Sequence, residues 1–425
     1  MSTLKRVAII GGKRIPFSRS FGAYSGVSTR DLMSASVKAL VEDYKLQDKT
    51  LGEVVLGAVM KHSKDWNMAR EVTLGSGLSP STPAYDIQQA CGTSLEAAIL
   101  VANKIALGQI DCGIAGGVDT NSDLPIVFSK SFSHRLLKSS RGRSFGEKIK
   151  PFMGMSLKEL KPVVPGVVEP RTKLSMGQHC ELMAQEWQIA RQEQDEFAIK
   201  SHHNAARAYE EGFFKDMMVE FKGLEKDNNV RPDTNLETMA KLKPAFERSE
   251  KGTLTAGNSS PLTDGSACVL LGSEEWAKAN NLPVLAYMSF SQTAAVDFVN
   301  GEGLLMAPAY AVSELLKKAN LNLQDFDYYE IHEAFAAQVL CTLKAWESEK
   351  FCKEKLGRDE ALGSIDRSKL NVTGSSVSIG HPFAATGARI IHTLAKLLDK
   401  KDQGRGLISI CTAGGMGVTA ILEKN

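Results

Sequence analysis

The sequence lacks the features that mark membrane, secreted and nucleic-acid-binding proteins. No apolar run approaches the roughly 18 to 20 residues that cross a bilayer, and the start, MSTLKRVAIIGGKRIPF, has too short an apolar core for a secretory signal. The 51 basic and 49 acidic residues leave a net charge of only +2, which gives no reason to expect a nucleic-acid partner. We therefore expect a cytoplasmic protein that begins with a buried strand.

The cysteines show no pattern of disulfide or metal sites. They are odd in number and include no CxxC pair, which argues against a disulfide framework and against structural zinc. We therefore expect no metal and a reducing compartment. The seven positions are Cys91, Cys112, Cys180, Cys268, Cys341, Cys352 and Cys411.

What is present is an α/β pattern that occurs twice. Across 425 residues, 43% of them hydrophobic, short β-branched runs alternate with helix-period stretches. LMSASVKALVEDYKL precedes LGEVVLGAV, and APAYAVSELLKKANL precedes FDYYEIHEAF, so that Lys38 aligns with Ser313. Each pair of segments predicts a helix followed by a strand.

A second unit is also repeated. AYDIQQACGTSLEAAILVANKIALGQIDCGIAGGVD matches SSVSIGHPFAATGARIIHTLAKLLDKKDQGRGLISICTAGGMG, and each predicts a turn, a helix, a strand and then Ala-Gly-Gly. We therefore expect two similar α/β halves packed together. The predicted apolar helix faces are Leu95, Ala98, Ile99, Ala102 and Ala106 in the first half and Ala384, Ala388, Ile391, Ala395 and Leu398 in the second.

The middle of the chain departs from this pattern. Residues 121–248 are richer in Lys, Arg, Met, Pro and Ser and have no clean sheet periodicity. We interpret them as an inserted loop domain between an N-terminal half, 1–120 and 249–273, and a C-terminal half, 274–425. Helix-forming residues over 177–212 predict one or two solvent-facing helices within the insertion.

Cys91 and His381 occupy corresponding turns of the two halves. Cys91 opens a helix, where unpaired backbone N–H groups and the helix dipole lower a thiol pKa from its usual value of about 8.5. His381 lies between Gly380 and Pro382, directly ahead of the other helix. If the turns face each other, the imidazole can take the thiol proton. A packing cysteine and a capping histidine are the alternatives.

Two further positions lie at predicted strand ends. Cys411 ends the strand GLISIC, at the edge where α/β sheets gather their sites, although a buried free cysteine is commonly a packing residue. His332 and Glu333 follow another buried strand, where they are either structural or donors to a developing oxyanion. The glycines after Cys411 do not form GxGxxG, so we expect no dinucleotide site.

Five segments occur in one order: YDIQQACGTS, TAGNSSPLTDGSA, IHEAFAAQ, GHPFAATGAR and CTAGGMG. Together they resemble the thiolase family, from Arg6 to the last strand. The resemblance implies a duplicated, five-layered α-β-α-β-α fold with an inserted loop domain. It also implies CoA thioesters as substrates, no permanently bound cofactor, and a homodimer or a dimer of dimers.

The resemblance also assigns the catalytic roles. Cys91 attacks the keto carbon of a 3-ketoacyl-CoA, His381 accepts its proton, and Cys411 protonates the departing enolate. His332, with a bound water, and His381 match the oxyanion site for the enolate. The backbone N–H groups of Cys91 and Ala413 match a second oxyanion hole.

The same resemblance assigns three further residues to contacts with the substrate. Ser260 matches a residue that touches the pantetheine arm of CoA, and Met176 and Phe335 match residues that line the acyl and thioester pocket. A turn-forming serine and a gap-filling methionine are the alternatives.

The departures from the commonest family pattern favour one branch of it. His332 stands where short-chain biosynthetic thiolases typically carry Asn, and HEAF looks like the β-subunits of fatty-acid oxidation complexes, which favours a degradative 3-ketoacyl-CoA thiolase. Ala413 replaces a frequent glycine.

Residues 130–173 hold eleven Lys or Arg against three Glu. Such a basic segment is typical of contact with an anionic membrane or with a hydratase–dehydrogenase α-subunit. The alternative is a solvated surface that attracts CoA phosphates.

Two rival functions remain open from the sequence. A 3-ketoacyl synthase shares the fold and uses one cysteine with two histidines, but it makes its carbanion by decarboxylation and needs no second acid–base cysteine. A non-catalytic scaffold could keep the same shell, although every expected catalytic position is filled here.

Overall fold

The computed structural model describes residues 4–425, so residues 1–3, the beginning of the predicted first half, lie outside the described residues. In the described part the strands form one path in the order β4-β3-β5-β6-β1-β7-β10-β9-β8, with β2 paired to β6. The strands are β1 Val7–Arg14, β2 Ser18–Arg19, β3 Glu53–Gly57, β4 Ala84–Ile87, β5 Cys112–Asp119, β6 Thr263–Ser273, β7 Ala286–Ala295, β8 Tyr328–Ile331, β9 Gly404–Thr412 and β10 Met416–Lys424.

The strand path divides into two sheets with the same internal order. From the centre outward, the first sheet runs β1-β6-β5-β3-β4 and the second runs β7-β10-β9-β8. A parallel bridge between Tyr329 and Leu370 takes the place of the outermost strand in the second sheet. The two sheets are joined by the pairing of β1 with β7, at Ala8 with Tyr287 and Ile9 with Ala286. The predicted duplication is therefore present in the topology.

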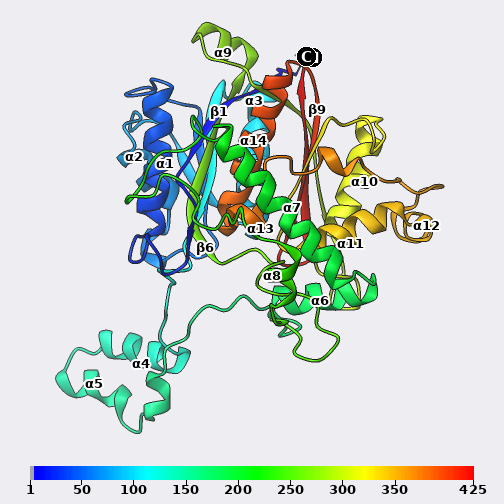
Figure 1. Ribbon diagram of the computed structural model, residues 1–425. Helices are drawn as coiled ribbons and strands as arrows, with labels where there is room; N and C mark the ends of the chain where they lie inside the picture. The colour runs from blue at the N-terminus through cyan, green and yellow to red at the C-terminus, as the bar shows by residue number, and fades with distance from the viewer. Residues whose placement is uncertain (1–3) are drawn as a thin grey trace.

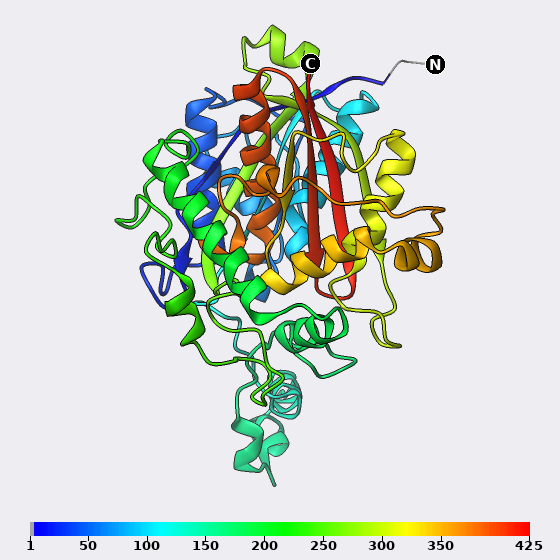
Figure 2. The same cartoon turned by 45° about the vertical axis from the view of Figure 1, so that its right-hand side comes forward.

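Helices fill three layers around these sheets (Figure 1). α3 and α14 pack against each other between the sheets, α1 and α2 cover the outer face of the first sheet, and α10 and α11 cover the outer face of the second. In Figure 2 the red strands of the second sheet lie between α14 and α10. The helices of the two halves are α1 Thr29–Asp43, α2 Met68–Gly75, α3 Thr93–Ala106, α9 Glu274–Ala279, α10 Ala307–Ala319, α11 Ala336–Glu347, α12 Glu349–Leu356, α13 Ser376–Ile379 and α14 Thr386–Lys401.

Alternation along the strands explains the layers. On β3, Val55 joins the central core while Val54 and Leu56 join the outer core, because successive strand side chains point to opposite faces. The predicted apolar faces of α3 and α14 lie in the central core, except that Ala384 precedes α14. The predicted five-layered α-β-α-β-α fold is confirmed.

The two central helices touch at their N-terminal ends. A Cβ on Gly387 would lie 2.4 Å from the backbone nitrogen of Leu95, so only glycine fits this approach. The Ser94 hydroxyl accepts a hydrogen bond of 2.8 Å from the backbone N–H of Ala388. This contact brings the turns that precede the helices together.

One part of the predicted repeat is wrong. Ala115-Gly116-Gly117 lies inside β5, whereas Ala413-Gly414-Gly415 forms the turn between β9 and β10. Gly414 and Gly415 have φ of 79° and 70°, a left-handed backbone that favours glycine, so the second glycine pair shapes a turn. On β5, Gly117 instead allows Ala384 to approach, since a Cβ there would lie 2.0 Å from the Ala384 carbonyl oxygen.

The middle segment consists of two structurally different parts. α4 Lys130–Ser140 and α5 Phe145–Ile149, with the 3-10 turns η3 Lys150–Phe152 and η4 Leu157–Leu160, form an arm that projects from the body (Figure 1). None of these four elements contains a buried residue. The division of the chain at 121–248 stays a prediction.

The remainder of the middle segment packs on the body. It contains α6 Met176–Glu186, α7 Arg191–Glu210 and α8 Leu236–Ala240. α6 and α7 both expose one face to solvent, as expected, and α7 buries its other face, including Ser201 and Ala205. Arg14 and Asp227 form a buried two-bond ion pair, 2.7 and 2.8 Å, that ties this segment to β1. Within residues 4–425, no helix is long and apolar enough to span a bilayer.

Candidate active site

Cys91 lies in a tight turn between β4 and α3. This turn is the 3-10 element η2 Ala90–Gly92, and Ala90 has φ of 46°, an uncommon left-handed conformation for a residue with a side chain. The Thr93 hydroxyl donates to the Ala90 carbonyl at 2.7 Å and accepts from the Gln89 N–H at 2.8 Å. These bonds hold the strained turn and place Cys91 at the N-terminal end of α3.

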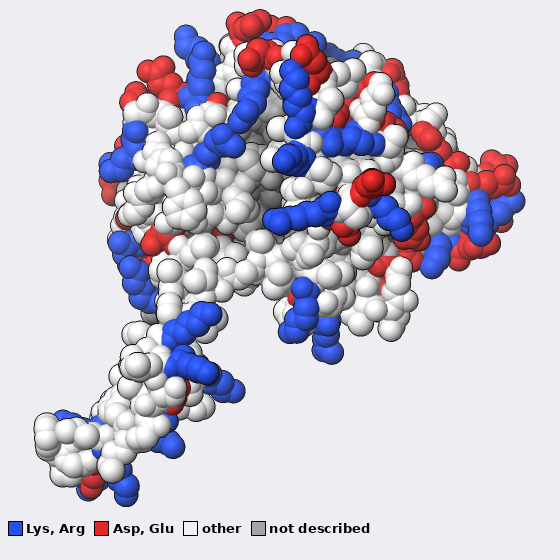
Figure 3. Space-filling model, turned by 60° about the horizontal axis from the view of Figure 1, so that its bottom comes forward, with Lys and Arg blue, Asp and Glu red and all other residues white. Residues whose placement is uncertain are grey.

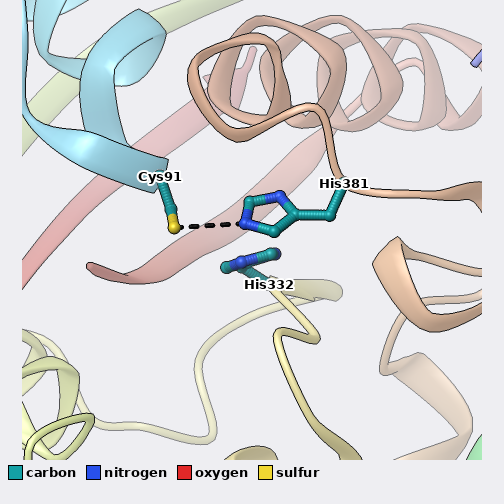
Figure 4. A group of neighbouring side chains, drawn as sticks. All are labelled: Cys91, His332 and His381. Atoms are coloured by element: carbon teal, nitrogen blue, oxygen red, sulfur yellow. Dashed lines mark hydrogen bonds between the residues drawn. The ribbon is translucent and has the colours of Figure 1, made fainter. Parts of the chain in front are cut away.

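His381 faces Cys91 from the matching turn of the second half. Its Nε2 atom lies 3.1 Å from Cys91 Sγ (Figure 4). Its backbone N–H donates to the Thr263 hydroxyl at 2.7 Å, and its Nδ1 lies 2.6 Å from the Thr386 hydroxyl. The preceding Gly380 has φ of 116°, which favours glycine. The predicted meeting of thiol and imidazole is present.

His332 lies beside this pair, directly after β8. Its ring centroid is 4.2 Å from that of His381, and its Nδ1 lies 2.8 Å from the Ser376 hydroxyl. Its Nε2 is buried and has no hydrogen-bond partner among residues 4–425. One ligand-type atom from each of Cys91, His332 and His381 lies within 4.8 Å of the others. This spacing would admit a metal ion, so the expectation of no metal stays a prediction.

Burial sets the protonation of the reactive pair. It raises the pKa of the Cys91 thiol to about 12, although the backbone N–H groups of Ala413 and Cys91 lower that pKa. Burial also lowers the pKa of His381 to about 3, with a smaller contribution from Arg389. The pair therefore rests as a neutral thiol and a neutral imidazole. The expected lowering of the thiol pKa by the helix start is wrong, because desolvation outweighs it.

Cys411 is the second-last residue of β9 and lies close to the Cys91 turn. It is 1% exposed, and burial, followed by the neighbouring Cys91, raises the pKa of its thiol well above the ordinary value. Gly92, next to Cys91, packs against the same strand end, since a Cβ there would lie 3.0 Å from the Thr412 side chain. The Cys411 thiol is therefore protonated and lies near Cys91.

A cavity opens at Cys91. It has a volume of about 330 Å³ and is lined by Met176, one of the residues predicted to line the acyl and thioester pocket. Ser260 and Phe335 are not among its lining residues; Ser260 donates its N–H to the Ala334 carbonyl at 3.0 Å. The lining residues are Val59, Met60, Ala90, Cys91, Gly166, Val167, Val168, Glu169, Pro170, Met176, Phe383, Ala413 and Gly414.

A second groove, of about 250 Å³, lies next to the loop that contains Ser260. Ser259 and Pro261 line it together with two cations, Arg19 and Arg231. The sequence did not single out these arginines, because isolated arginines in unlike segments carry no motif. Paired guanidinium groups suit phosphate oxygens.

The site is held by polar groups that sequence reasoning also missed. Asp119, at the end of β5, accepts backbone N–H bonds from Val59, Met60 and Ala384 at 2.9, 2.7 and 2.7 Å. It therefore joins a loop of the first half to the turn that carries His381. Burial raises the pKa of Asp119 to about 7.

Glu333 is a structural neighbour of His332. Its carboxylate accepts from the Ser201 hydroxyl, the Asn371 side-chain amide and the Val377 N–H at 2.7, 2.7 and 3.1 Å. These bonds fix α7 and the segment before α13 behind the histidines. Of the two open interpretations of Glu333, the geometry favours the structural one.

Comparison with known proteins completes the description. Family models described as thiolase, N-terminal domain, and thiolase, C-terminal domain, match residues 7–275 and 282–424. The chain is 42% identical over 425 residues to a 3-ketoacyl-CoA thiolase of Shewanella baltica (strain OS185), covering 99% of this chain and 97% of the relative.

Two solved structures share the fold over the full chain. The acetyl-CoA acetyltransferase of Bacillus anthracis superimposes with a TM-score of 0.82 at 32% identity, covering 100% of both chains. The human mitochondrial 3-ketoacyl-CoA thiolase in complex with CoA superimposes with a TM-score of 0.82 at 27% identity, covering 100% of this chain and 99% of that chain.

Proposed function

The chain belongs to the thiolase family, and on that premise we propose that it cleaves 3-ketoacyl-CoA with CoA, and runs the reverse Claisen condensation, through an acyl-Cys91 intermediate. The observation that carries this proposal is the 3.1 Å contact between Cys91 Sγ and His381 Nε2, beside the unpartnered Nε2 of His332. This arrangement supplies a nucleophile, its base and an oxyanion donor in one buried place.

In the first step Cys91 adds to the keto carbon while His381 Nε2 takes its proton. A neutral imidazole is the form that can act as this base, and the lowered pKa of His381 keeps it neutral. The keto oxygen becomes an oxyanion, for which the backbone N–H groups of Cys91 and Ala413 are the proposed donors. Their effect on the pKa of the Cys91 thiol supports this position.

In the second step the bond between the α- and β-carbons breaks. Its electron pair moves to the α-carbon as the enolate of acetyl-CoA, while the acyl group remains on Cys91 as a thioester. His332 and His381 are the proposed donors to the enolate oxygen, directly or through water. Cys411 then protonates the α-carbon, and its high pKa, raised by burial, keeps the thiol protonated until that moment. A CoA thiol finally attacks the thioester and gives its proton to the Cys411 thiolate. The bond from the acyl carbon to Cys91 Sγ breaks, Cys91 regains its proton from protonated His381, and the shortened acyl-CoA leaves.

The groove beside Ser259 is the proposed path of CoA. Arg19 and Arg231 line it and can meet phosphate oxygens. Ser260, in the adjoining position, stays the proposed contact of the pantetheine arm, and Phe335 and Met176 stay proposed contacts of the acyl and thioester groups. CoA acts here as a substrate, and the absence of a permanent cofactor stays a prediction.

The wider assignments are part of the same proposal. The HEAF segment at His332 favours degradation of fatty acids by β-oxidation, in the cytoplasm, by a homodimer or a dimer of dimers.

The surface of the arm combines basic and apolar side chains. Figure 3 shows Lys and Arg along it, and Phe145, Met153 and Leu157 are 79, 73 and 83% exposed. Such a surface suits an anionic membrane or a hydratase–dehydrogenase α-subunit.

Thiolysis assays test the central proposal. Purified protein with acetoacetyl-CoA and longer 3-ketoacyl-CoA thioesters should consume CoA, and mass spectrometry should find the acyl group on Cys91. Condensation that requires a malonyl thioester would instead indicate a 3-ketoacyl synthase. A protein with neither activity would be a scaffold. For the arm, vesicles with and without anionic lipid, and gel filtration with the α-subunit, separate its two proposed contacts from a merely solvated surface.

A further inference from the structure

We propose that Ser376 is a positioning residue that fixes the tautomer of His332, so that His332 presents an N–H at Nε2 to the substrate. The proposal rests on the proposed function, since the substrate oxygen it serves is that of the enolate. It adds a residue that none of the five sequence motifs pointed to.

One direction of the hydrogen bonds around Ser376 uses its hydroxyl fully. Its hydroxyl oxygen lies 2.8 Å from His332 Nδ1 and accepts from Arg389 Nη2 at 3.0 Å. An arginine side chain has donors and no acceptor. If the hydroxyl also accepted from His332 Nδ1–H, its own buried hydrogen would have no acceptor among residues 4–425, so the hydroxyl donates to His332 Nδ1. When Nδ1 accepts, a neutral imidazole must carry its proton on Nε2.

The surroundings keep Arg389 charged and His332 neutral, and the assigned hydrogen bonds require both. Arg389 stays a cation at neutral pH because its pKa, lowered by burial, is still about 10, and Glu330 lies 3.9 Å from it. His332 stays neutral because burial, His381 and Arg389 hold its pKa well below the ordinary value. Ser376, His332 and Arg389 are all at most 1% exposed, so water does not compete for these bonds.

The neighbouring histidine is held in the opposite tautomer. His381 Nε2 faces the Cys91 thiol at 3.1 Å and must offer a lone pair to take its proton. Its own proton then lies on Nδ1, which is 2.6 Å from the Thr386 hydroxyl. Two rings with centroids 4.2 Å apart are thus fixed by two hydroxyls in complementary forms, one as the base and the other as the donor.

If the proton of His332 lay on Nδ1, Nε2 could not donate a hydrogen bond, while His381 could still act as the base. The Nε2 lone pair of His332 would then face a developing negative oxygen, which repels it. Removing one preorganised oxyanion donor costs about 10² to 10³-fold in rate. The cost should fall on enolate formation and spare acyl transfer to Cys91.

Two partial reactions separate these steps. Deuterium uptake into the methyl group of acetyl-CoA reports enolate formation, and exchange of labelled CoA with acetyl-CoA reports acylation of Cys91. We expect Ser376→Ala to slow deuterium uptake about tenfold, because the ring can then adopt either tautomer. Ser376→Asp, whose carboxylate accepts from Nδ1–H, should slow it about 10²-fold. CoA exchange should stay within about threefold of wild type.

Matched variants show whether the effect belongs to the hydroxyl. Ser376→Thr keeps the donor and should restore deuterium uptake. Ser375→Ala removes a hydroxyl that lies 3.1 Å from Arg389 but forms no hydrogen bond with His332, and it should leave both exchanges unchanged. Nitrogen-15 NMR of histidine-labelled wild type, with His332→Gln to assign the signal, should show the proton on Nε2.

Three results would overturn the proposal. They are an Nδ1–H signal for His332 in the wild type, equal losses of both exchanges in Ser376→Ala, and unchanged deuterium uptake in Ser376→Asp. Failure of the proposed function gives a different result, because wild type would then lack both exchanges. The NMR signal of His332 would still decide the tautomer in that case.

Discussion

The two halves of the molecule share a layout and differ in chemistry. Read outward from β1 and β7, the strands have the same order, and in each half a turn leads into a central helix, α3 or α14. The first turn carries the proposed nucleophile, Cys91, and the second carries its proposed base, His381, 3.1 Å away. Duplication thus supplied two facing positions, and the residue type at each position decides its role.

The strand ends show the same contrast. β5 ends at Asp119, whose carboxylate holds three backbone N–H groups, one of them in the other half. β9 ends beside Cys411, which has a thiol with a high pKa near the first sulfur. The polar end of the first half is therefore a structural clamp, whereas the end of the second half carries the proposed proton donor.

Removing the nucleophile should have the largest effect on this comparison. Cys91→Ala should lower CoA exchange by at least about 10⁴-fold, since no acyl-enzyme can form without the nucleophile, and deuterium uptake, which reports the enolate step, should fall much less. Cys112→Ala, at the buried start of β5, is the matched control and should keep both. Retained CoA exchange in Cys91→Ala would show that the first half does not carry the nucleophile.

Replacing the base should cost somewhat less and change the pH dependence. His381→Asn should slow CoA exchange about 10² to 10⁴-fold at pH 7. Because burial raises the pKa of the Cys91 thiol to about 12, its thiolate fraction without a base rises tenfold per pH unit below that value. Alkylation of Cys91 by iodoacetamide in this variant should therefore rise about tenfold per pH unit, or about 100-fold between pH 7 and pH 9. A plateau near pH 8 would instead mean that the thiol pKa is not raised.

Cys411→Ala should separate the steps that the two halves serve. Deuterium uptake should fall about 10² to 10⁴-fold, the usual contribution of a general acid or base, while CoA exchange stays within about threefold. Cys352→Ala, at another buried cysteine, serves as the control. If both exchanges fell equally, Cys411 would support the Cys91 turn rather than transfer the proton.

The clamp at Asp119 should show the smallest effect. Asp119→Asn replaces one accepting oxygen by a donor, which leaves a buried N–H unpaired at a cost of about 1 to 3 kcal/mol. The unfolding temperature should fall, and thiolysis should slow about tenfold because the turn with His381 loosens. Asp111→Asn, whose side chain is 65% exposed, should change neither in a paired melting and activity assay.

Local patterns carried the prediction of much of the fold. Helical spacing identified the buried faces of α3 and α14, and the order of five motifs identified the residues that meet at the site. The predictions failed where long-range contacts decide. Ala115-Gly116-Gly117 was aligned with the turn after β9 by letters alone, although its place in the sheet differs. The buried contact of α7 was not predicted, because nothing in its polar sequence shows that Ser201 reaches Glu333.

The sequence by itself determined the inventory: a duplicated α/β chain with two cysteines and two histidines in recognisable segments, because periodicity and residue type are local properties. Tertiary structure decided the protonation states and tautomers of those groups. Cys91 and His381 lie 290 residues apart in the chain, and His332 and Ser376 lie 44 apart. Protonation and tautomer follow from burial and from such distant partners. Burial and these contacts exist only after the two halves have folded and packed together.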